Sequence, residues 1–167
     1  MSELATIEQT ESSRPQALTA LILSIVDRSL LVPNTAVAEL ISWQPVDELP
    51  GGVQKKDGLV GRIAWRGLQV PLVSFEVLAG GEEPDVTEET RIAILNSLDP
   101  EAGLSFYAVL LQGIPRPVQV SAALQTVSQS PRPGEQQLVQ LDGQLLAIPA
   151  LEDLEHNLIR SRLQQRF

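Results

Sequence analysis

The side chains that usually carry out nucleophilic catalysis are almost missing from this chain. Its 167 residues include no cysteine, one histidine and one tyrosine. A serine nucleophile needs an adjacent base, and the histidine, His156, lies in a segment that we expect to be helical, where we interpret it as a surface or packing residue. The lack of cysteine also excludes disulfides, thiolate metal sites and thiol redox chemistry. We therefore predict that the protein is not an enzyme.

A run of carboxylates is the second group with a capacity for chemistry. The stretch from Ala79 to Thr90 carries five acidic side chains and no basic one, together with Gly80, Gly81 and Pro84. Paired carboxylates can act as general acid and base, but this role needs a buried environment that a solvated loop does not provide. The run also lacks the alternating oxygen ligands of a calcium loop. We interpret it as a solvated loop between two halves of the fold, and we predict no metal or cofactor.

Charge and hydropathy argue against two classes of partner. The chain has 12 Lys and Arg against 21 Asp and Glu, a net charge of −9, without the clustered basic surface that nucleic-acid binding needs. The apolar stretch Ala20–Val26 is far shorter than the roughly 20 residues that span a bilayer. The N-terminus has no signal-peptide pattern. We expect residues 1–16 to be a disordered tail of a cytoplasmic protein that does not insert directly into a membrane.

Three hairpins recur along the chain, each made of two apolar segments around a short polar break. The paired segments are Leu18–Val26 with Leu30–Val32, Leu59–Trp65 with Leu68–Val73, and Leu138–Leu141 with Leu145–Ile148. In the third hairpin, Asp142-Gly143 favours a tight turn. The second strand of each hairpin contains an aliphatic residue followed by proline. Because proline cannot donate to a ladder, we interpret these prolines as strand ends or unpaired edge positions.

Two further strands and one helix complete the pattern. The strands Arg91–Leu98 and Leu104–Leu111 flank the turn signal Asp99–Gly103, so we expect them to pair. Strands of this length between Gly and Pro turns predict an all-β barrel or sandwich. Only Leu151–Arg166 has helical periodicity, and its acidic start and arginine-rich end complement the helix dipole.

The second hairpin carries a recognisable motif. Residues 58–73 read GLVGRIAWRGLQVPLV, and their most specific part is Arg66-Gly67 followed two residues later by Val70-Pro71. This stretch resembles the central signature of CheW-like domains, the coupling proteins of bacterial chemotaxis arrays. The resemblance extends from about Ala17 to Leu154. It implies an all-β fold of two intertwined five-stranded SH3-like β-barrels with a C-terminal helix, as a CheW-like domain over residues 17–155 and a helical extension over residues 156–167.

The resemblance also implies a function without chemistry. CheW-like proteins bind the regulatory domain of a CheA-type histidine kinase and the cytoplasmic tip of a methyl-accepting chemoreceptor, in receptor arrays at the inner membrane. The residues that match positions important for receptor coupling in the family are Val37, Glu39, Gly61, Arg66 and Gly67. Because Arg66 lies at a turn and can reach a carboxylate, we predict an ion pair between Arg66 and Glu39.

Kinase contacts in the family are apolar patches on the first barrel. The segment Trp43–Pro50 offers Trp43, Val46 and Leu49 as candidates for this contact. The alternative is that these side chains only pack beneath their loop. Trp65, which also precedes a turn, is likewise either a core residue or a binding anchor.

Several positions depart from the family pattern. Ala64-Trp65 replaces the usual Asn-Leu, Ser74 replaces an Asp, and Leu111-Gln112 replaces Val-Asp. Pro115 and Pro117 predict a sheet edge or a bend. These changes suggest a specialised relative that serves a surface-motility or pilus pathway. Two alternatives remain open, namely a CheW-like competitor or tuner that binds a single partner, and a small β-barrel that binds a small ligand.

Overall fold

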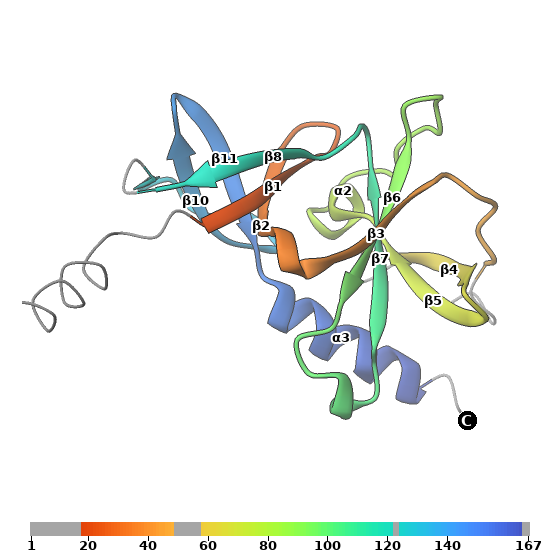
Figure 1. Cartoon of the computed structure of the whole chain (residues 1–167). Coiled ribbons are helices and arrows are strands. Elements are labelled where there is room, and N and C mark those ends of the chain that lie inside the picture. The colour runs from red at the N-terminus through yellow and green to blue at the C-terminus, as the bar shows by residue number, and fades with distance from the viewer. Residues whose placement is uncertain (1–17, 49–57, 122–123, 165–167) are drawn as a thin grey trace, which may run out of the picture.

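The computed structural model describes residues 18–48, 58–121 and 124–164, with side chains up to residue 161 (Figure 1). The predicted tail, residues 1–16, lies outside the described residues. The elements, in chain order, are β1 (Leu18–Ser24), β2 (Ser29–Pro33), η1 (Asn34–Ala36), β3 (Val37–Ser42), β4 (Leu59–Trp65), β5 (Leu68–Val73), α2 (Phe75–Leu78), β6 (Arg91–Asn96), η4 (Pro100–Ala102), β7 (Phe106–Leu111), β8 (Arg116–Val120), β9 (Gln125–Thr126), β10 (Glu135–Leu141), β11 (Gln144–Pro149) and α3 (Leu151–Gln164).

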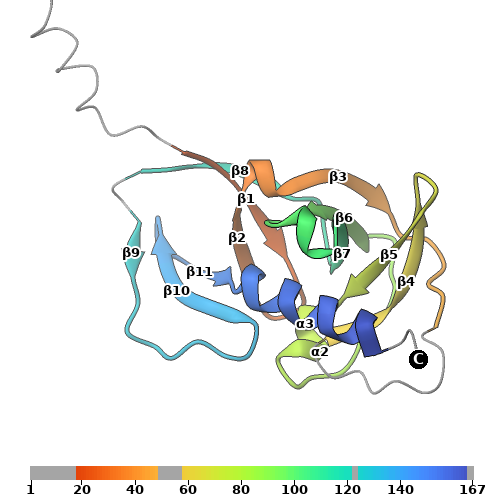
Figure 2. The same cartoon turned by 90° about the horizontal axis from the view of Figure 1, so that it is seen from below.

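The strands form two sheets, and all the strands of one sheet lie in the chain between strands of the other. The six-stranded sheet has the order β8-β1-β2-β11-β10-β9, and the five-stranded sheet has the order β3-β6-β7-β5-β4. Strands β3 to β7 follow one another in the chain, between β2 and β8 of the other sheet (Figures 1 and 2). The predicted all-β fold with a C-terminal helix is confirmed. The six-stranded sheet exceeds the expected five strands because the two-residue β9 pairs with β10.

The predicted hairpins are all present. β1–β2, β4–β5 and β10–β11 pair antiparallel, and so do β6 and β7. Two of the hairpins turn in two residues that both have positive φ, Arg66 (48°) with Gly67 (78°) and Asp142 (50°) with Gly143 (80°). This is the primed turn whose twist matches that of the strands. The first and third hairpin prolines end β2 and β11, as expected. Pro115 directly precedes the edge strand β8 and Pro117 lies in it, which agrees with the predicted sheet edge.

Pro71 departs from this expectation, because it lies inside β5 between two neighbouring strands. It pairs with Arg62 of β4, whose backbone N–H and C=O instead bond to Asp47 at 2.9 and 2.8 Å. The β4–β5 ladder therefore needs no N–H at Pro71. On its other side, β5 pairs with β7 only from Leu72 onward. Proline is tolerated here because neither neighbour requires its missing donor.

Three apolar clusters hold the fold together. One lies within each sheet, and the largest joins the two sheets beneath α3. This shared cluster combines Leu23 and Leu30 of the six-stranded sheet, Tyr107 of the five-stranded sheet, and Leu154 and Leu158 of α3. Figure 2 shows α3 lying across the underside of the molecule. Within the described ranges, no helix is both long and apolar enough to cross a membrane.

Two boundaries were expected from the sequence, one at the acidic stretch and one at residue 155. The acidic stretch is an exposed connection from α2 to β6, two elements of the same five-stranded region, so it does not separate two halves of the fold. The chain passes between sheets instead at η1, after β2, and after β7. The division at residue 155 falls inside α3, and as a domain boundary it stays a prediction.

Candidate functional site

The predicted ion pair at the β4–β5 turn is present. Arg66 Nη2 lies 3.4 Å from Glu39 Oε2, with the Arg66 side chain 69% exposed and the Glu39 side chain 36% exposed. The turn places Arg66 at the tip of the hairpin, and β3 supplies Glu39 from a neighbouring part of the surface. An ion pair this exposed adds little to stability. Its effect is on the shape and charge of the surface.

Trp65 takes a larger part in this site than the sequence indicated. Its indole Nε1–H donates to Glu39 Oε2 at 2.6 Å, the same oxygen that Arg66 approaches. The Arg66 guanidinium carbon lies 5.1 Å from the centroid of the Trp65 ring. Phe106 also contacts Trp65 edge-on, at a centroid distance of 4.9 Å and an interplanar angle of 64°. We call Glu39, Trp65, Arg66 and Phe106 the Trp65 cluster.

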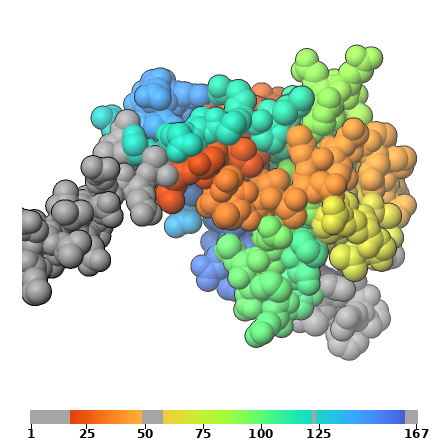
Figure 3. All heavy atoms as spheres, in the orientation of Figure 1, coloured from red at the N-terminus to blue at the C-terminus, as the bar shows by residue number. Residues whose placement is uncertain are grey.

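The Trp65 cluster forms because the five-stranded sheet closes on itself. β3 and β4 are its two edge strands, yet the segment after β3 crosses to β4. Gln44 Nε2 donates to the carbonyl oxygen of Ala64 at 2.7 Å, and Asp47 exchanges two backbone hydrogen bonds with Arg62. Figure 3 shows the orange surface of this segment directly beside the yellow surface of the β4–β5 hairpin. Closure of the sheet therefore brings Glu39 to Trp65.

The two glycines predicted for this site have different structural roles. Gly61 is buried, and a Cβ there would overlap Val46 Cγ1 and lie 2.7 Å from the carbonyl oxygen of Asp47. Gly61 therefore allows the crossing segment to lie flat on β4 and is not itself a contact surface. Gly67 has a φ of 78° and open space around its Cα, so it serves the turn.

The remaining predicted site residues lie apart from the ion pair. Val37 is half-buried against the cluster shared by the two sheets. Among the kinase candidates, Trp43 is 39% exposed, whereas Val46 packs against the apolar cluster of the five-stranded sheet. The third candidate, Leu49, lies outside the described residues. Of the two candidates that the structure describes, Trp43 exposes apolar surface, whereas Val46 packs beneath its own loop. His156 is exposed on α3.

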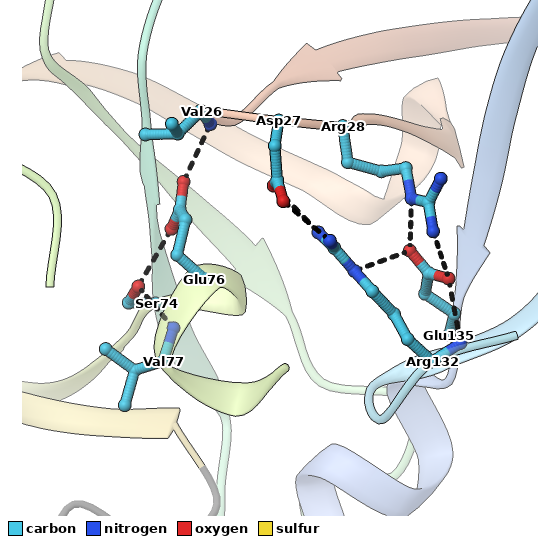
Figure 4. A network of polar contacts seen from close by, with 8 residues as sticks. All are labelled: Val26, Asp27, Arg28, Ser74, Glu76, Val77, Arg132 and Glu135. Atoms are coloured by element: carbon cyan, nitrogen blue, oxygen red, sulfur yellow. Dashed lines mark hydrogen bonds and ion pairs between the residues drawn. The ribbon is translucent and has the colours of Figure 1, made fainter. Parts of the chain in front are cut away.

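A polar network at the β1–β2 turn was missed by sequence reasoning (Figure 4). Arg132 donates to both carboxylate oxygens of Asp27 at 2.7 and 2.9 Å. Its Nε lies 3.2 Å from Glu135, which also pairs with Arg28. The Arg132 guanidinium lowers the pKa of Asp27 below its usual range. Asp27 and Arg28 lie more than one hundred residues before Arg132 and Glu135, their respective partners, so no local pattern indicates these two pairs.

The departure at Ser74 has a local structural explanation. Ser74 is the N-cap of α2, and its Oγ accepts a hydrogen bond from the Val77 N–H at 3.2 Å. The same hydroxyl donates to Glu76 Oε2 at 2.8 Å. Glu76 is buried and also accepts the Val26 N–H at 3.0 Å (Figure 4). Ser74 thus replaces one capping residue by another and joins α2 to the end of the β1 hairpin.

A second buried carboxylate attaches α3 to the five-stranded sheet. Glu155 is 4% exposed and accepts hydrogen bonds from Ser97 Oγ at 2.5 Å and from the Leu98 N–H at 2.7 Å. The hydroxyl of Tyr107 lies 3.4 Å from Glu155 Oε2. Burial and the negative charge of Glu155 raise the pKa of Tyr107 well above its usual range. This carboxylate has a structural role, since it satisfies donors of the β6–η4 connection.

Comparison with known proteins identifies this architecture. Residues 19–157 match the family model described as a CheW-like domain. The chain belongs to the CheW-like domain family. A crystal structure of the scaffolding protein TtCheW from Thermoanaerobacter tengcongensis is similar, with a TM-score of 0.68 and 14% identity over 85% of this chain and 90% of that one. At this identity, the likeness confirms the fold. A comparison with curated proteins finds no match. Proteins of the CheW-like family are scaffolds of chemotaxis signal transduction.

Proposed function

We propose that this CheW-like protein is a non-enzymatic adaptor that couples the cytoplasmic tip of a chemoreceptor to the regulatory domain of a CheA-type histidine kinase. The observation that carries the proposal is the pair formed by Arg66 of the β4–β5 turn and Glu39 of β3, two of the positions that the resemblance to the family assigns to receptor coupling. Gly61 lies beneath the segment that crosses β4, Gly67 forms part of the turn, and Val37 precedes Glu39 by two residues in β3. The adaptor works in the cytoplasm and is recruited to receptor arrays at the inner membrane.

The kinase contact is proposed on the segment after β3. Trp43 is its exposed aromatic residue, and aromatic residues are frequent anchors of protein interfaces. Val46 is less suited to a test, because its side chain covers Gly61 and a large substitution there would disturb packing. Trp43→Ala is therefore the variant that separates kinase binding from folding.

Calorimetric titration of the purified protein tests both contacts. The ligands are the receptor-tip fragments and histidine-kinase regulatory domains of the same organism. We expect Arg66→Glu to weaken binding of the receptor fragment at least tenfold and to leave binding of the kinase domain unchanged. We expect Trp43→Ala to weaken binding of the kinase domain at least tenfold and to leave binding of the receptor fragment unchanged. Arg116→Glu is the matched charge control, because Arg116 is exposed on the edge strand β8. Binding to neither ligand by the folded protein contradicts the adaptor function, and binding to one supports a single-partner tuner.

The motif departures support assignment to a surface-motility or pilus pathway. Trp65, which replaces the usual leucine of the motif, contacts both Glu39 and Arg66, so the proposed receptor surface differs chemically from that of the usual motif. Expression in a bacterium that lacks its general chemotaxis coupler tests this assignment. We expect no recovery of swimming chemotaxis. Full recovery would show that the protein is a general coupler.

A further inference from the structure

Trp65 and Arg66 both approach the carboxylate of Glu39, but at different distances. The indole N–H of Trp65 lies 2.6 Å from Glu39 Oε2, whereas the nearest guanidinium nitrogen of Arg66 lies 3.4 Å from it. The uncharged indole is therefore the closer donor to the carboxylate. Because Trp65 holds Glu39, Arg66 is only loosely engaged by its own ion pair.

The guanidinium of Arg66 is oriented without being covered. It lies over the Trp65 ring at 5.1 Å, and its side chain is 69% exposed. Stacking on an aromatic face restricts the plane of a guanidinium and leaves its N–H edges free to donate. Those edges match a carboxylate in a two-pronged hydrogen-bond geometry.

The ring that orients Arg66 is itself held in place. Trp65 is half-buried, packs against the cluster of the five-stranded sheet, and meets Phe106 edge-on at 4.9 Å. A group that is already held in its binding orientation loses less conformational freedom when a partner binds. A leucine at this position would offer neither the N–H for Glu39 nor the ring face for Arg66, so the two charges would pair with each other.

We propose that Trp65 is the positioning residue that makes this face selective for a partner carboxylate. It engages Glu39 and presents Arg66, so the face binds an acidic side chain on the receptor tip more tightly than the corresponding amide. This inference rests on the proposed receptor-coupling function, and it adds the chemistry of the partner and the residue that sets the preference.

The test uses the full-length protein, one receptor-tip fragment from the same organism, and a series of variants of that fragment. In each variant, a single exposed Asp or Glu is changed to Asn or Gln. For the unchanged protein, we expect one such change to weaken binding about tenfold. Trp65→Leu should reduce this preference to less than about threefold. Trp65→Phe, which keeps a ring but loses the N–H, should fall between the two.

A second substitution separates this role from a merely structural one. If Glu39 competes for Arg66 once the indole N–H is lost, Glu39→Gln in the Trp65→Phe background should restore the preference for the acidic fragment. A structural defect would not be repaired in this way. If Trp65→Leu keeps the full preference for the acidic fragment, or if the double variant does not recover it, the inference is wrong and the proposed coupling function is unaffected. Failure of the unchanged protein to bind any receptor fragment overturns the proposed coupling function, and the inference with it.

Discussion

Arg28 and Glu135 are separated by 107 residues in the chain and form a two-pronged ion pair. Arg28 Nε lies 2.7 Å from Glu135 Oε2, and Arg28 Nη2 lies 3.2 Å from Oε1. The side chain of Glu135 is 2% exposed. Arg132 approaches the same carboxylate through Nε at 3.2 Å (Figure 4). One buried negative charge thus links the β1–β2 turn to the start of β10 within the six-stranded sheet.

Loss of Arg28 should destabilise the protein measurably. Arg28→Ala leaves the buried Glu135 with Arg132 as its remaining ionic partner. Hydrogen bonds to charged groups contribute about 1.5–3 kcal/mol, so we expect a loss of about 2 kcal/mol in the free energy of unfolding. Urea unfolding at pH 7 measures it. Arg116→Ala, at an exposed position, should change that free energy by less than about 0.5 kcal/mol. Equal effects of the two substitutions would contradict the importance of this pair.

The ion pair of Asp27 and Arg132 should add stability that depends on pH. The hydrogen bonds from Arg132 lower the pKa of Asp27 in the folded state. A group with a depressed folded pKa contributes stability above its unfolded pKa, about 4, and loses that contribution as the pH falls through the folded value. Because Asp27 is largely exposed, we expect Asp27→Asn to cost roughly 0.5 kcal/mol at pH 7.

Thermal or urea unfolding of Asp27→Asn and the unchanged protein, from pH 7 to pH 2, measures this dependence. The difference between the two proteins should be constant near neutral pH and disappear in strong acid. A difference that persists unchanged at pH 2 would show that the carboxylate charge is not its source.

A methyl group at Gly61 should destabilise the fold, by pressing on the segment that crosses β4. The added Cβ would overlap Val46 Cγ1 and lie 2.7 Å from the carbonyl oxygen of Asp47. Overpacking of this kind costs about 1–3 kcal/mol. Gly67→Ala is the control, since it meets open space and changes only a positive-φ turn position, at a cost of about 1 kcal/mol.

Val46→Ala in the Gly61→Ala background separates the two contacts of the added methyl group. We expect partial recovery of the free energy of unfolding, because the overlap with Val46 is relieved and the contact with the Asp47 backbone remains. Full recovery would mean that the backbone contact costs nothing. No recovery would place the whole cost on the backbone.

Removal of the Glu155 carboxylate should loosen α3. Glu155→Ala leaves the buried Ser97 hydroxyl and the Leu98 N–H without their acceptor. Each unsatisfied buried donor costs about 1–3 kcal/mol, so we expect a loss of about 3 kcal/mol by urea unfolding. Tyr107→Phe removes only the long 3.4 Å contact to the same carboxylate and should cost less. A larger cost for Tyr107→Phe than for Glu155→Ala would contradict this ranking.

The single tyrosine of the chain reports on its own ionisation. Burial, with the charge of Glu155, raises the pKa of Tyr107 in the folded state. A raised folded pKa contributes stability that is complete below the unfolded pKa, about 10, and declines as the pH rises beyond it. In an alkaline titration we therefore expect phenolate absorbance to appear together with loss of circular dichroism. Phenolate absorbance near pH 10 in a folded protein would contradict the buried environment of Tyr107.

The local elements of this protein were determined by its sequence alone. The apolar segments around Arg66-Gly67 and Asp142-Gly143 predicted two hairpins, with a tight turn at Asp142-Gly143, and both turns have two residues with positive φ. The resemblance to CheW-like domains, together with the position of Arg66 at a turn, predicted the ion pair of Arg66 with Glu39. The hairpin predictions succeed because strand patterning and turn chemistry depend on residues a few positions apart.

Tertiary structure alone decided which distant segments meet. It set the strand orders, let Pro71 lie within a central strand, and placed Trp65 against Glu39. It also brought together the Arg28–Glu135 pair. Such contacts depend on sheet closure and on burial of the apolar core, which are properties of the whole chain. Because a hydrogen bond or ion pair of this kind links residues without a fixed spacing in the sequence, no local pattern could reveal it.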